Sequence, residues 1–371
     1  MINEKLLKKE EKAVFELRSL YRQYGYQPFK MNKFEEYDFY VRNKDFLVSD
    51  SVITFNDTNG KLLALKPDVT LSIIKNTKDK EGCKQKLCYN ENVYRVSGST
   101  HQFKEIMQTG LECIGDIDIS DIYEVIYLAS KSLDMISNDF IIDISHMGII
   151  TSLLLSINKE KAFHKEAIKY ISEKNPHELY DLCKRNNVDE EKTNQLIKLV
   201  QTYGNINEVI ESMEKEGIPK EIKKPFSELK AISKLIKNSE YSSKFNIDFS
   251  VVNDMNYYNG IVFKGFLKGV SEGVLSGGQY DSLMVNMGRN SKAIGFALYL
   301  DLLEEIDNNK KEFDVDVLLL YDDKISTERL IREKEKLISI GFNVSAQKKI
   351  PEGLRYMTIM DLNDMGVQKN D

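Results

Sequence analysis

Residues 86–115 read KLCYNENVYRVSGSTHQFKEIMQTGLECIG, and in them two β-rich runs flank a polar stretch. We expect two strands joined by a loop at residues 97–102. Consecutive strands without a crossover helix between them pair antiparallel. This stretch therefore favours an antiparallel sheet.

The second of these strands, MQTGLECIG at residues 107–115, carries two polar side chains on one face. Side chains two residues apart share a face of a strand, so Gln108, Gly110 and Glu112 point the same way. Gln108 and Glu112 would lie about 13 Å apart. Either this face is half-exposed, or it is the floor of a pocket in which Glu112 pairs with an ammonium group and Gln108 fixes its orientation.

On the N-terminal side, SVITFNDTNGKLLALKP at residues 51–67 predicts a hairpin around the turn at residues 56–60. A helix should follow Pro67. Asp68 and Thr70 stand at its start, where they can cap the helix or contact a ligand. Further upstream, apolar residues at three- and four-residue spacing predict an amphipathic helix from Asn3 to Tyr24.

On the C-terminal side, Ser120 and Asp121 are expected to cap a helix, and residues 140–144 to form a buried strand. From Met147 to about Asn238 the periodicity is helical throughout. A helical insertion therefore interrupts the sheet.

Strand patterns resume with FNIDFSVV at residues 245–252, and a hairpin is expected at Asn259-Gly260. Further strands are expected in VLSGGQYDSL and AIGFALYLDLL, and a short β-α-β tail in DVDVLLLY, residues 326–340, FNVSA and RYMTIMD. The predicted fold is α+β: a core of residues 1–310 with an insertion at about 147–240, and a tail of residues 311–371.

Composition sets limits on the class of protein. At 371 residues the length suggests two or three domains. A hydrophobic fraction of 42% with 30% charged residues excludes intrinsic disorder. The net charge of -6 and the pI near 5.6 argue against a protein that grips a nucleic-acid backbone. Since no run approaches the roughly 20 apolar residues of a membrane span and the start does not follow a signal peptide, we expect a cytoplasmic protein.

Metal chemistry has little support in the sequence. The four cysteines form no C-x-x-C pair and the four histidines form no H-E-x-x-H motif. Two other segments could serve a ligand: Tyr257 and Tyr258 bring phenol groups beside a turn, and residues 276–281 offer backbone that a ligand can approach closely.

Taken in order, these segments resemble the catalytic core of histidyl-tRNA synthetase, a class II aminoacyl-tRNA synthetase fold. LALKPDVT is similar to the family's L-x-L-R-P-E-x-T, and NVYR followed by MQTGLECIG is similar to its second class-defining motif. NDMNYYNGIVF is similar to R-G-L-D-Y-Y-T-G-x-V-F, and SGGQYDSL through AIGFALYLDLL is similar to the third motif. The resemblance runs from about residue 5 to about residue 305.

Several charged positions depart from the family's pattern. The arginine of the histidine motif falls at Asn253, and the ATP-binding arginine of the third motif at Leu302. In the same comparison, the glutamate after the second-motif arginine falls at Ser97, the arginine of R-P-E at Lys66 and the dimer-motif proline at Asn32. The second-motif arginine is retained as Arg95. Losing two preorganised donors would cost about 6 kcal/mol, or about 10⁴-fold in rate. These departures argue against a competent synthetase.

The amino-acid pocket is better retained. The resemblance implies a histidine-binding site made of Asp68, Thr70, Arg95, Gln108, Glu112, Tyr257, Tyr258 and Tyr280. A synthetase core without its ATP-binding arginines resembles the ATP phosphoribosyltransferase regulatory subunits, the synthetase paralogues of histidine biosynthesis. That resemblance implies a non-catalytic chain without cofactor, metal, nucleic acid or membrane.

The same resemblance implies the partners. They are a short-form catalytic subunit, which would need this chain for activity and for feedback inhibition by histidine, and a second copy in a self-dimer within the hetero-oligomer. Fewer than 70 residues follow Leu303, whereas an anticodon-binding domain needs about a hundred.

Other functions stay open at this point. A divergent histidyl-tRNA synthetase or a related amino-acid ligase would share the fold, and a tRNA-binding module without chemistry is a third possibility. DVLLLYDDKIST superficially resembles a phosphoribosyl-pyrophosphate loop. It lacks the glycine-rich turn that holds phosphate, so we expect a strand followed by a helix cap.

Overall fold

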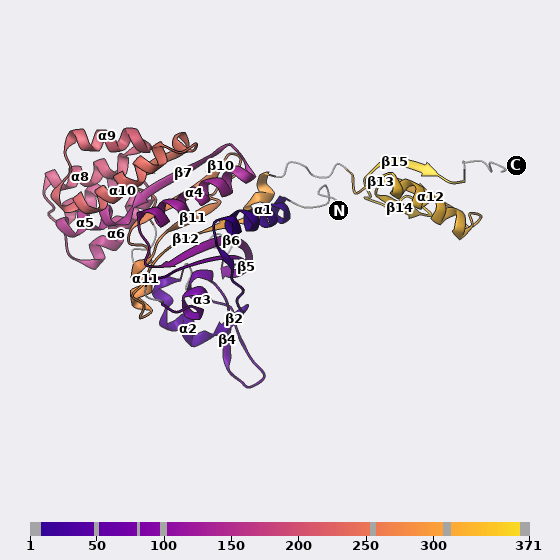
Figure 1. Ribbon diagram of the computed structural model, residues 1–371, viewed down its shortest axis with the longest axis horizontal. Coiled ribbons are helices and arrows are strands. Elements are labelled where there is room, and N and C mark those ends of the chain that lie inside the picture. The colour runs from indigo at the N-terminus through magenta and orange to yellow at the C-terminus, as the bar shows by residue number, and fades with distance from the viewer. Residues whose placement is uncertain are drawn as a thin grey trace. The chain divides into compact units, whose positions relative to one another are not determined.

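The computed structural model describes residues 9–47, 52–79, 82–96, 102–252, 257–306 and 313–363. The chain divides into two compact units, Met1–Ile306 and Asp307–Asp371. Figure 1 shows the elements of each.

A nine-stranded sheet forms the centre of the first unit. Its neighbours pair antiparallel except for two parallel pairs, β1 with β5 and β7 with β9. The predicted antiparallel sheet is therefore confirmed. In spatial order the strands are β1 (Gln27–Pro28), β5 (Lys84–Val96), β6 (Phe103–Gly115), β12 (Lys292–Tyr299), β11 (Leu275–Gln279), β10 (Ile261–Leu267), β7 (Phe140–His146), β9 (Phe245–Asp248) and β8 (Tyr203–Asn205).

The predicted pair of strands within residues 86–115 is confirmed as β5 and β6, each 13 residues long. The loop expected between them at residues 97–102 lies outside the described residues except for Gln102. Register pairs Tyr89 with Gly110 and Leu87 with Glu112. The two long strands therefore carry the polar face of β6 into the middle of the sheet.

Helices α1 (Lys9–Gln23) and α4 (Ile119–Ile136) pack together and against the sheet. Leu17 and Tyr21 of α1 are buried, and Tyr21 shares a hydrogen bond of 3.0 Å with Ser132 of α4. The predicted cap of α4 is right for Asp121, which belongs to a capping box, and wrong for Ser120. Asp118 caps the helix, because its carboxylate accepts from the backbone N–H groups of Ser120 and Asp121 while Asp121 reciprocates.

A second, small antiparallel sheet lies beside the main one, in the order β2 (Phe34–Glu36), β4 (Leu62–Leu65), β3 (Thr54–Asn56). The predicted hairpin at residues 51–67 is confirmed as β3 and β4. Helix α3 follows Pro67 as predicted, and Asp68 caps it by accepting from Leu71 N at 2.8 Å. The neighbouring helices are α2 (Tyr37–Arg42), η2 (Lys44–Phe46) and α3 (Val69–Asn76).

The insertion between β7 and β9 consists mainly of helices, as Figure 1 shows. The prediction that this stretch is helical throughout is wrong at β8, because Tyr203–Asn205 pairs antiparallel with β9 and ends the main sheet. Its helices are α5 (Met147–Ile157), α6 (Lys161–Ser172), α7 (Pro176–Arg185), α8 (Glu190–Gln201), α9 (Ile206–Glu216), η3 (Lys220–Ile222) and α10 (Lys223–Lys237), followed by η4 (Ser242–Lys244).

The hairpin expected at Asn259-Gly260 is also wrong. The strand before this turn, β9, pairs with β7, and β10 pairs with β7 and β11. Gly260 is needed for another reason, since a Cβ there would lie 2.3 Å from the Gln279 side chain. The remaining elements of this unit are α11 (Asp281–Asn286) and η5 (Leu300–Ile306).

The second unit is the predicted β-α-β tail. Its parallel sheet has the order β14 (Val344–Gln347), β13 (Val315–Leu320), β15 (Tyr356–Asp361), with α12 (Thr327–Ser339) between β13 and β14. Ser326 caps α12, accepting from Arg329 N. The strand and helix cap expected around Asp322 are therefore confirmed.

A buried ion pair fixes the segment that leads into α3. The Lys66 side chain is 0% exposed, and its Nζ donates to Glu91 Oε2 of β5 at 2.6 Å. The Lys66 backbone N–H donates to Lys33 O, and its carbonyl oxygen accepts from Tyr94 N. Because a buried ammonium without a counter-ion is costly, Glu91 is required where the chain turns toward Asp68.

Glu91→Ala should therefore lower the free energy of unfolding by roughly 3 kcal/mol, because it strands the Lys66 charge. Glu36→Ala is the matched control: it breaks the Lys61–Glu36 pair, whose side chains are 65% and 62% exposed, and should change stability by no more than about 0.5 kcal/mol. Urea titrations of both variants measure the difference. Equal effects would mean that the Lys66 pair is not a structural requirement.

Candidate ligand-binding site

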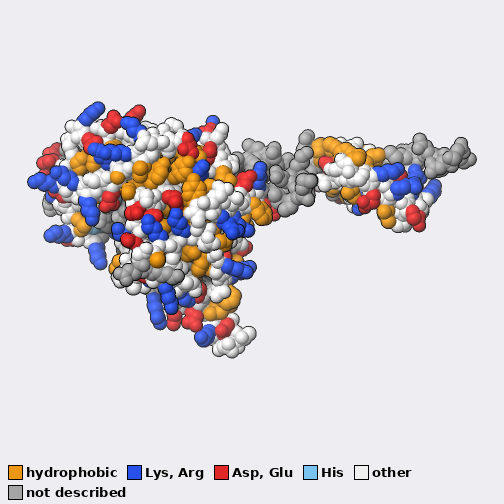
Figure 2. All heavy atoms as spheres, in the orientation of Figure 1, with side chains coloured by type: hydrophobic (Ala, Val, Ile, Leu, Met, Phe, Trp, Pro, Cys, Tyr) orange, Lys and Arg blue, Asp and Glu red, His pale blue; other side chains and the backbone are white. Residues whose placement is uncertain are grey.

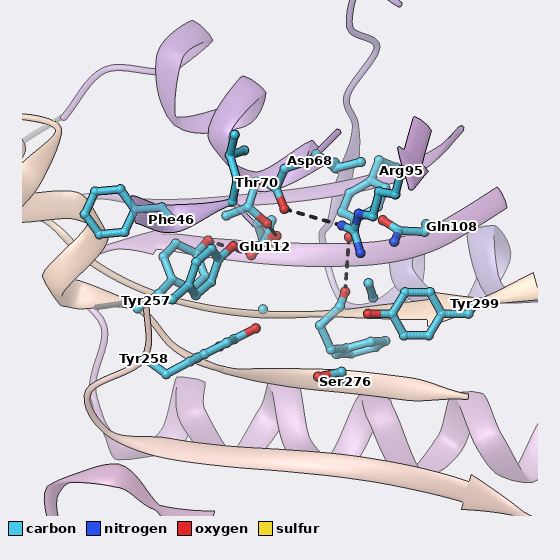
Figure 3. A pocket seen from close by; sticks show the side chains of 17 residues that line it. Phe46, Asp68, Thr70, Arg95, Gln108, Glu112, Tyr257, Tyr258, Ser276 and Tyr299 are labelled. Carbon is cyan, nitrogen blue, oxygen red and sulfur yellow. Dashed lines mark hydrogen bonds and ion pairs between the residues drawn. The ribbon is translucent and has the colours of Figure 1, made fainter. Parts of the chain in front are cut away.

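A cavity of about 380 Å³ lies on the face of the main sheet, between β6, β11 and β12 and the start of α3. Figure 3 shows its side chains converging from these elements. Every site residue predicted from the sequence lines this cavity: Asp68, Thr70, Arg95, Gln108, Glu112, Tyr257, Tyr258 and Tyr280.

Glu112 is the floor of the cavity and is 2% exposed. Thr70 Oγ1 donates to its Oε1 at 2.7 Å, and the Tyr280 hydroxyl donates to its Oε2 at 2.5 Å. On β12, Gly295 is its cross-strand partner, and a Cβ there would stand 1.7 Å from Glu112 Oε2. Only glycine leaves room for the carboxyl group at this position.

Burial raises the pKa of Glu112 to about 8, and the nearby Asp68 charge acts in the same direction. The two hydroxyl donors oppose this shift without cancelling it. Without a ligand the group is therefore mostly protonated at pH 7. A cationic ligand that enters would favour its ionised form.

Asp68 and Arg95 form the charged side of the cavity (Figure 3). Arg95 Nη2 lies 3.7 Å from Asp68 Oδ2, and Arg95 Nε donates to Pro67 O at 2.7 Å. Burial raises the pKa of Asp68, while Arg95 and the α3 backbone lower it. The cavity thus holds a carboxylate and a guanidinium side by side.

Gln108 has an unused donor. Its side chain is 2% exposed, and its Nε2 has no hydrogen-bond partner among the described residues. A buried polar group left unpaired costs about 1–3 kcal/mol. Because Gln108 lines the cavity, an acceptor on a bound molecule would remove that cost.

Tyrosine rings form the opposite side. The rings of Tyr257 and Tyr258 lie 4.6 Å apart, and those of Tyr257 and Tyr280 lie 6.0 Å apart. A Cβ at Gly278 would lie 2.7 Å from the Tyr258 ring, so this glycine allows the ring to approach β11 closely. The tyrosines give the cavity flat apolar faces with polar edges.

Ser276, at the start of the segment that was expected to approach a ligand, lines the cavity as well. Sequence reasoning missed several other lining residues, among them Phe46, Leu47, Tyr89 and Tyr299. Two of them follow from sheet register, because Tyr89 pairs with Gly110 and Tyr299 with Gln108. Pairing partners across an antiparallel ladder share a face. The register of β5 and β12 was not available from the sequence.

The described positions that depart from the synthetase pattern do not line the cavity. Lys66 is buried against Glu91 and does not line the cavity, and Leu302 packs against the main hydrophobic core. Asn253 and Ser97 lie outside the described residues. Asn32 does not line the cavity either.

The described part of the chain has neither a metal-binding cluster nor a membrane-spanning helix. It contains no group of three His, Cys, Asp or Glu side chains that could hold a metal ion. Its cysteines are free thiols, with Cys83 exposed and Cys88, Cys113 and Cys183 buried. None of its helices is both long enough and apolar enough to cross a membrane.

Known proteins share both sequence and fold with this chain. The histidyl-tRNA synthetase sequence family matches residues 2–303. An ATP phosphoribosyltransferase regulatory subunit from Caldanaerobacter subterraneus subsp. tengcongensis is 30% identical over 289 residues, which cover 76% of this chain and 75% of that protein.

Two solved structures are similar. An ATP phosphoribosyltransferase regulatory subunit/histidyl-tRNA synthetase from Bacillus halodurans C has a TM-score of 0.73 and 22% identity, over 95% of this chain and 93% of that one. The ATP phosphoribosyl transferase (HisG:HisZ) complex from Thermotoga maritima contains a chain with a TM-score of 0.62 and 22% identity, over 78% of this chain and 97% of that one.

The antiparallel sheet, its flanking helices and the cavity on its face define a class II aminoacyl-tRNA synthetase-like protein. The sequence match narrows this class. The chain belongs to the histidyl-tRNA synthetase family and, within it, to the ATP phosphoribosyltransferase regulatory subunits.

The raised pKa of Glu112 predicts a pH dependence of stability. Because the folded state binds this proton more tightly than the unfolded state, whose pKa is near 4.5, the stabilisation is complete below pH 4.5 and is lost as pH rises through about 8. Glu112→Gln removes the titration. Its stability relative to the parent chain should therefore increase steadily between pH 5 and pH 8.

Urea unfolding of both chains without histidine, at intervals across that range, measures the effect. Altered hydrogen bonding to Thr70 and Tyr280 would add a constant offset but no slope. Parallel pH curves would contradict the assignment of a raised pKa to Glu112.

Proposed function

We propose that this chain is a non-catalytic regulatory subunit that assembles with a short-form ATP phosphoribosyltransferase catalytic subunit and binds histidine in the Glu112 cavity. In this proposal the catalytic subunit needs the chain for activity and for feedback inhibition in the first step of histidine biosynthesis. The observation that carries it is the buried Glu112 together with Gln108 on the same strand, whose Nε2 donor has no hydrogen-bond partner among the described residues.

The cavity's charges suit a free amino acid. Such a ligand carries an ammonium and a carboxylate, and the lining offers the acids Glu112 and Asp68 with the donors Arg95 and Gln108. The tyrosine rings would flank a planar imidazole. Glu112 is the partner for a protonated nitrogen of the ligand, and Gln108 for one of its oxygens.

The number of polar contacts is sufficient for a metabolite sensor. A hydrogen bond to a charged group contributes roughly 1.5–3 kcal/mol, so two or three correspond to a micromolar to millimolar dissociation constant. Tighter binding would keep a feedback site saturated.

The surroundings of the cavity support a non-catalytic role. Arg95 is the single arginine among the described lining residues, and it is already bonded to Pro67 O. Leu302, at the position of the ATP-binding arginine, is apolar and packs against the core. Activation of an amino acid needs preorganised cations for the phosphates of ATP, and this cavity offers few.

Surface charge supports the absence of tRNA binding. On the face drawn in Figure 2, Lys and Arg side chains are interspersed with Asp and Glu over the insertion. The net charge is -6. We propose a cytoplasmic chain that dimerises with itself inside the hetero-oligomer.

Glu112→Gln should weaken histidine binding at least tenfold, because the neutral amide cannot neutralise a cationic nitrogen of the ligand. Calorimetry on the parent chain should also show affinity rising with pH toward 8, as Glu112 ionises more easily. Glu105→Gln is the matched control, since Glu105 lies on the same strand and bonds Asn92 and Tyr94 outside the cavity. Equal affinities in all three chains would return Glu112 to a structural role.

Mixing the chain with a short catalytic subunit should produce phosphoribosyltransferase activity that histidine inhibits. The coupling free energy expected between two such sites is ~1–3 kcal/mol, so bound histidine should change substrate affinity at the catalytic site about 5- to 150-fold. A catalytic subunit whose activity does not change when the chain is added would overturn the proposal.

The family match to histidyl-tRNA synthetase makes an active ligase the second candidate. Histidine-dependent exchange between ATP and pyrophosphate would establish ligase activity, and we expect no such exchange.

A further inference from the structure

A thin wall separates the Glu112 cavity from a second cavity of about 470 Å³. The wall consists of residues 257–260 and 279–281, whose side chains face opposite ways. The first cavity is lined by Tyr257, Tyr258 and Tyr280, and the second by Asn259, Gly260, Gln279 and Asp281.

The wall is held together as one unit. Gln279 Oε1 accepts from Ile261 N at 2.7 Å, and Gln279 O accepts from Asn259 N at 3.1 Å. Asn259 Oδ1 in turn accepts from Asp281 N at 2.9 Å. These bonds join both segments of the wall, so a displacement of one carries the other.

Behind the wall, polar contacts connect it to the helical insertion. Gly260 O accepts from Met147 N at 2.8 Å, at the start of α5. The adjacent His146 accepts from Gly148 N through Nδ1 at 3.0 Å, and its Nε2 lies 3.2 Å from Glu228 Oε2 on α10. His146 is 2% exposed, so the histidine end of this pair is buried, whereas the Glu228 side chain is 44% exposed.

The contacts behind the wall lie at the end of a strand ladder. Ile261 pairs with His146 in the antiparallel β7–β10 ladder, and the Gly260–Met147 bond continues that ladder by one residue. Gly260, His146 and Glu228 also line the second cavity, so the space beside these contacts is a cavity rather than packed side chains. The wall therefore meets the insertion through this ladder end and the His146–Glu228 pair.

We propose that His146 and Glu228 are positioning residues that couple the Glu112 cavity to the helical insertion. A ligand that packs against Tyr257 and Tyr258 fixes the wall, and the Gly260–Met147 bond transmits this to His146 and from there to α10. The inference rests on the proposed function, because it takes histidine as the ligand. It adds that the insertion responds to that ligand although none of its residues lines the cavity.

The first test compares two buried histidines. His146→Ala should weaken histidine binding about fivefold, the lower end of coupling between sites. His164→Ala is the matched control: His164 is 7% exposed and bonded to Asn158 O in α6, away from the wall. Both variants remove a buried imidazole and its hydrogen bonding, but only His146→Ala should change affinity in calorimetry.

A second variant protects the test against misfolding. Glu228 is 44% exposed, so Glu228→Ala should fold, and it should weaken binding as His146→Ala does. The double variant should lose little more affinity than either single variant, because both substitutions remove the same His146–Glu228 contact. Affinities unchanged in His146→Ala and Glu228→Ala, or equal losses in His164→Ala, would overturn the inference.

Hydrogen exchange on the unmodified chain supplies an independent readout. Saturating histidine should slow amide exchange in peptides covering residues 146–150 and 223–237, and leave residues 190–201 of α8 unchanged. Protection confined to residues lining the cavity would overturn the coupling while leaving the proposed function intact. If the parent chain binds no histidine in calorimetry, the proposed function itself fails.

Discussion

A carboxyl group buried in the middle of a sheet is the constraint that organises this structure. Glu112 is removed from water, so its oxygens require donors from the protein. They come from distant parts of the chain, Thr70 at the start of α3 and Tyr280 before α11. Gly295 completes the arrangement by leaving space on β12. Folding of four separate segments is thereby tied to one polar contact set, which is also the floor of the ligand cavity.

Sequence periodicity predicted this floor because the relevant pattern is local. Gln108 and Glu112 share a face through the two-residue repeat of a strand, and the absence of a crossover helix predicted antiparallel pairing. Long-range pairing defeated the same reasoning elsewhere. Asn259-Gly260 has the composition of a hairpin turn, but β7 lies between the strands on either side of it. The short strand β8 was missed because three residues inside a helical stretch carry no periodicity of their own.

The fold alone does not decide between ligase and regulator. The same sheet and cavity suit both, so the distinction depends on which charges surround the ligand. Here the acids Asp68 and Glu112 and the amide group of Gln108 line the cavity, and Arg95 is the one arginine among the described lining residues. A sensor needs only the recognition half of a ligase. A sensor also requires that ligand binding in the cavity change the conformation or the affinity of another part of the assembly.

The strand β8 has a consequence for how the insertion can vary. Tyr203–Asn205 belongs to the insertion by sequence but to the main sheet by hydrogen bonding, where it covers the outer edge of β9. Excising the helices as a block would leave that edge unpaired, and bare sheet edges recruit other chains. Shortening between α5 and α8 leaves the edge covered, whereas complete removal invites aggregation. Because one strand of the insertion is part of the main sheet, the insertion can become shorter more easily than it can be lost.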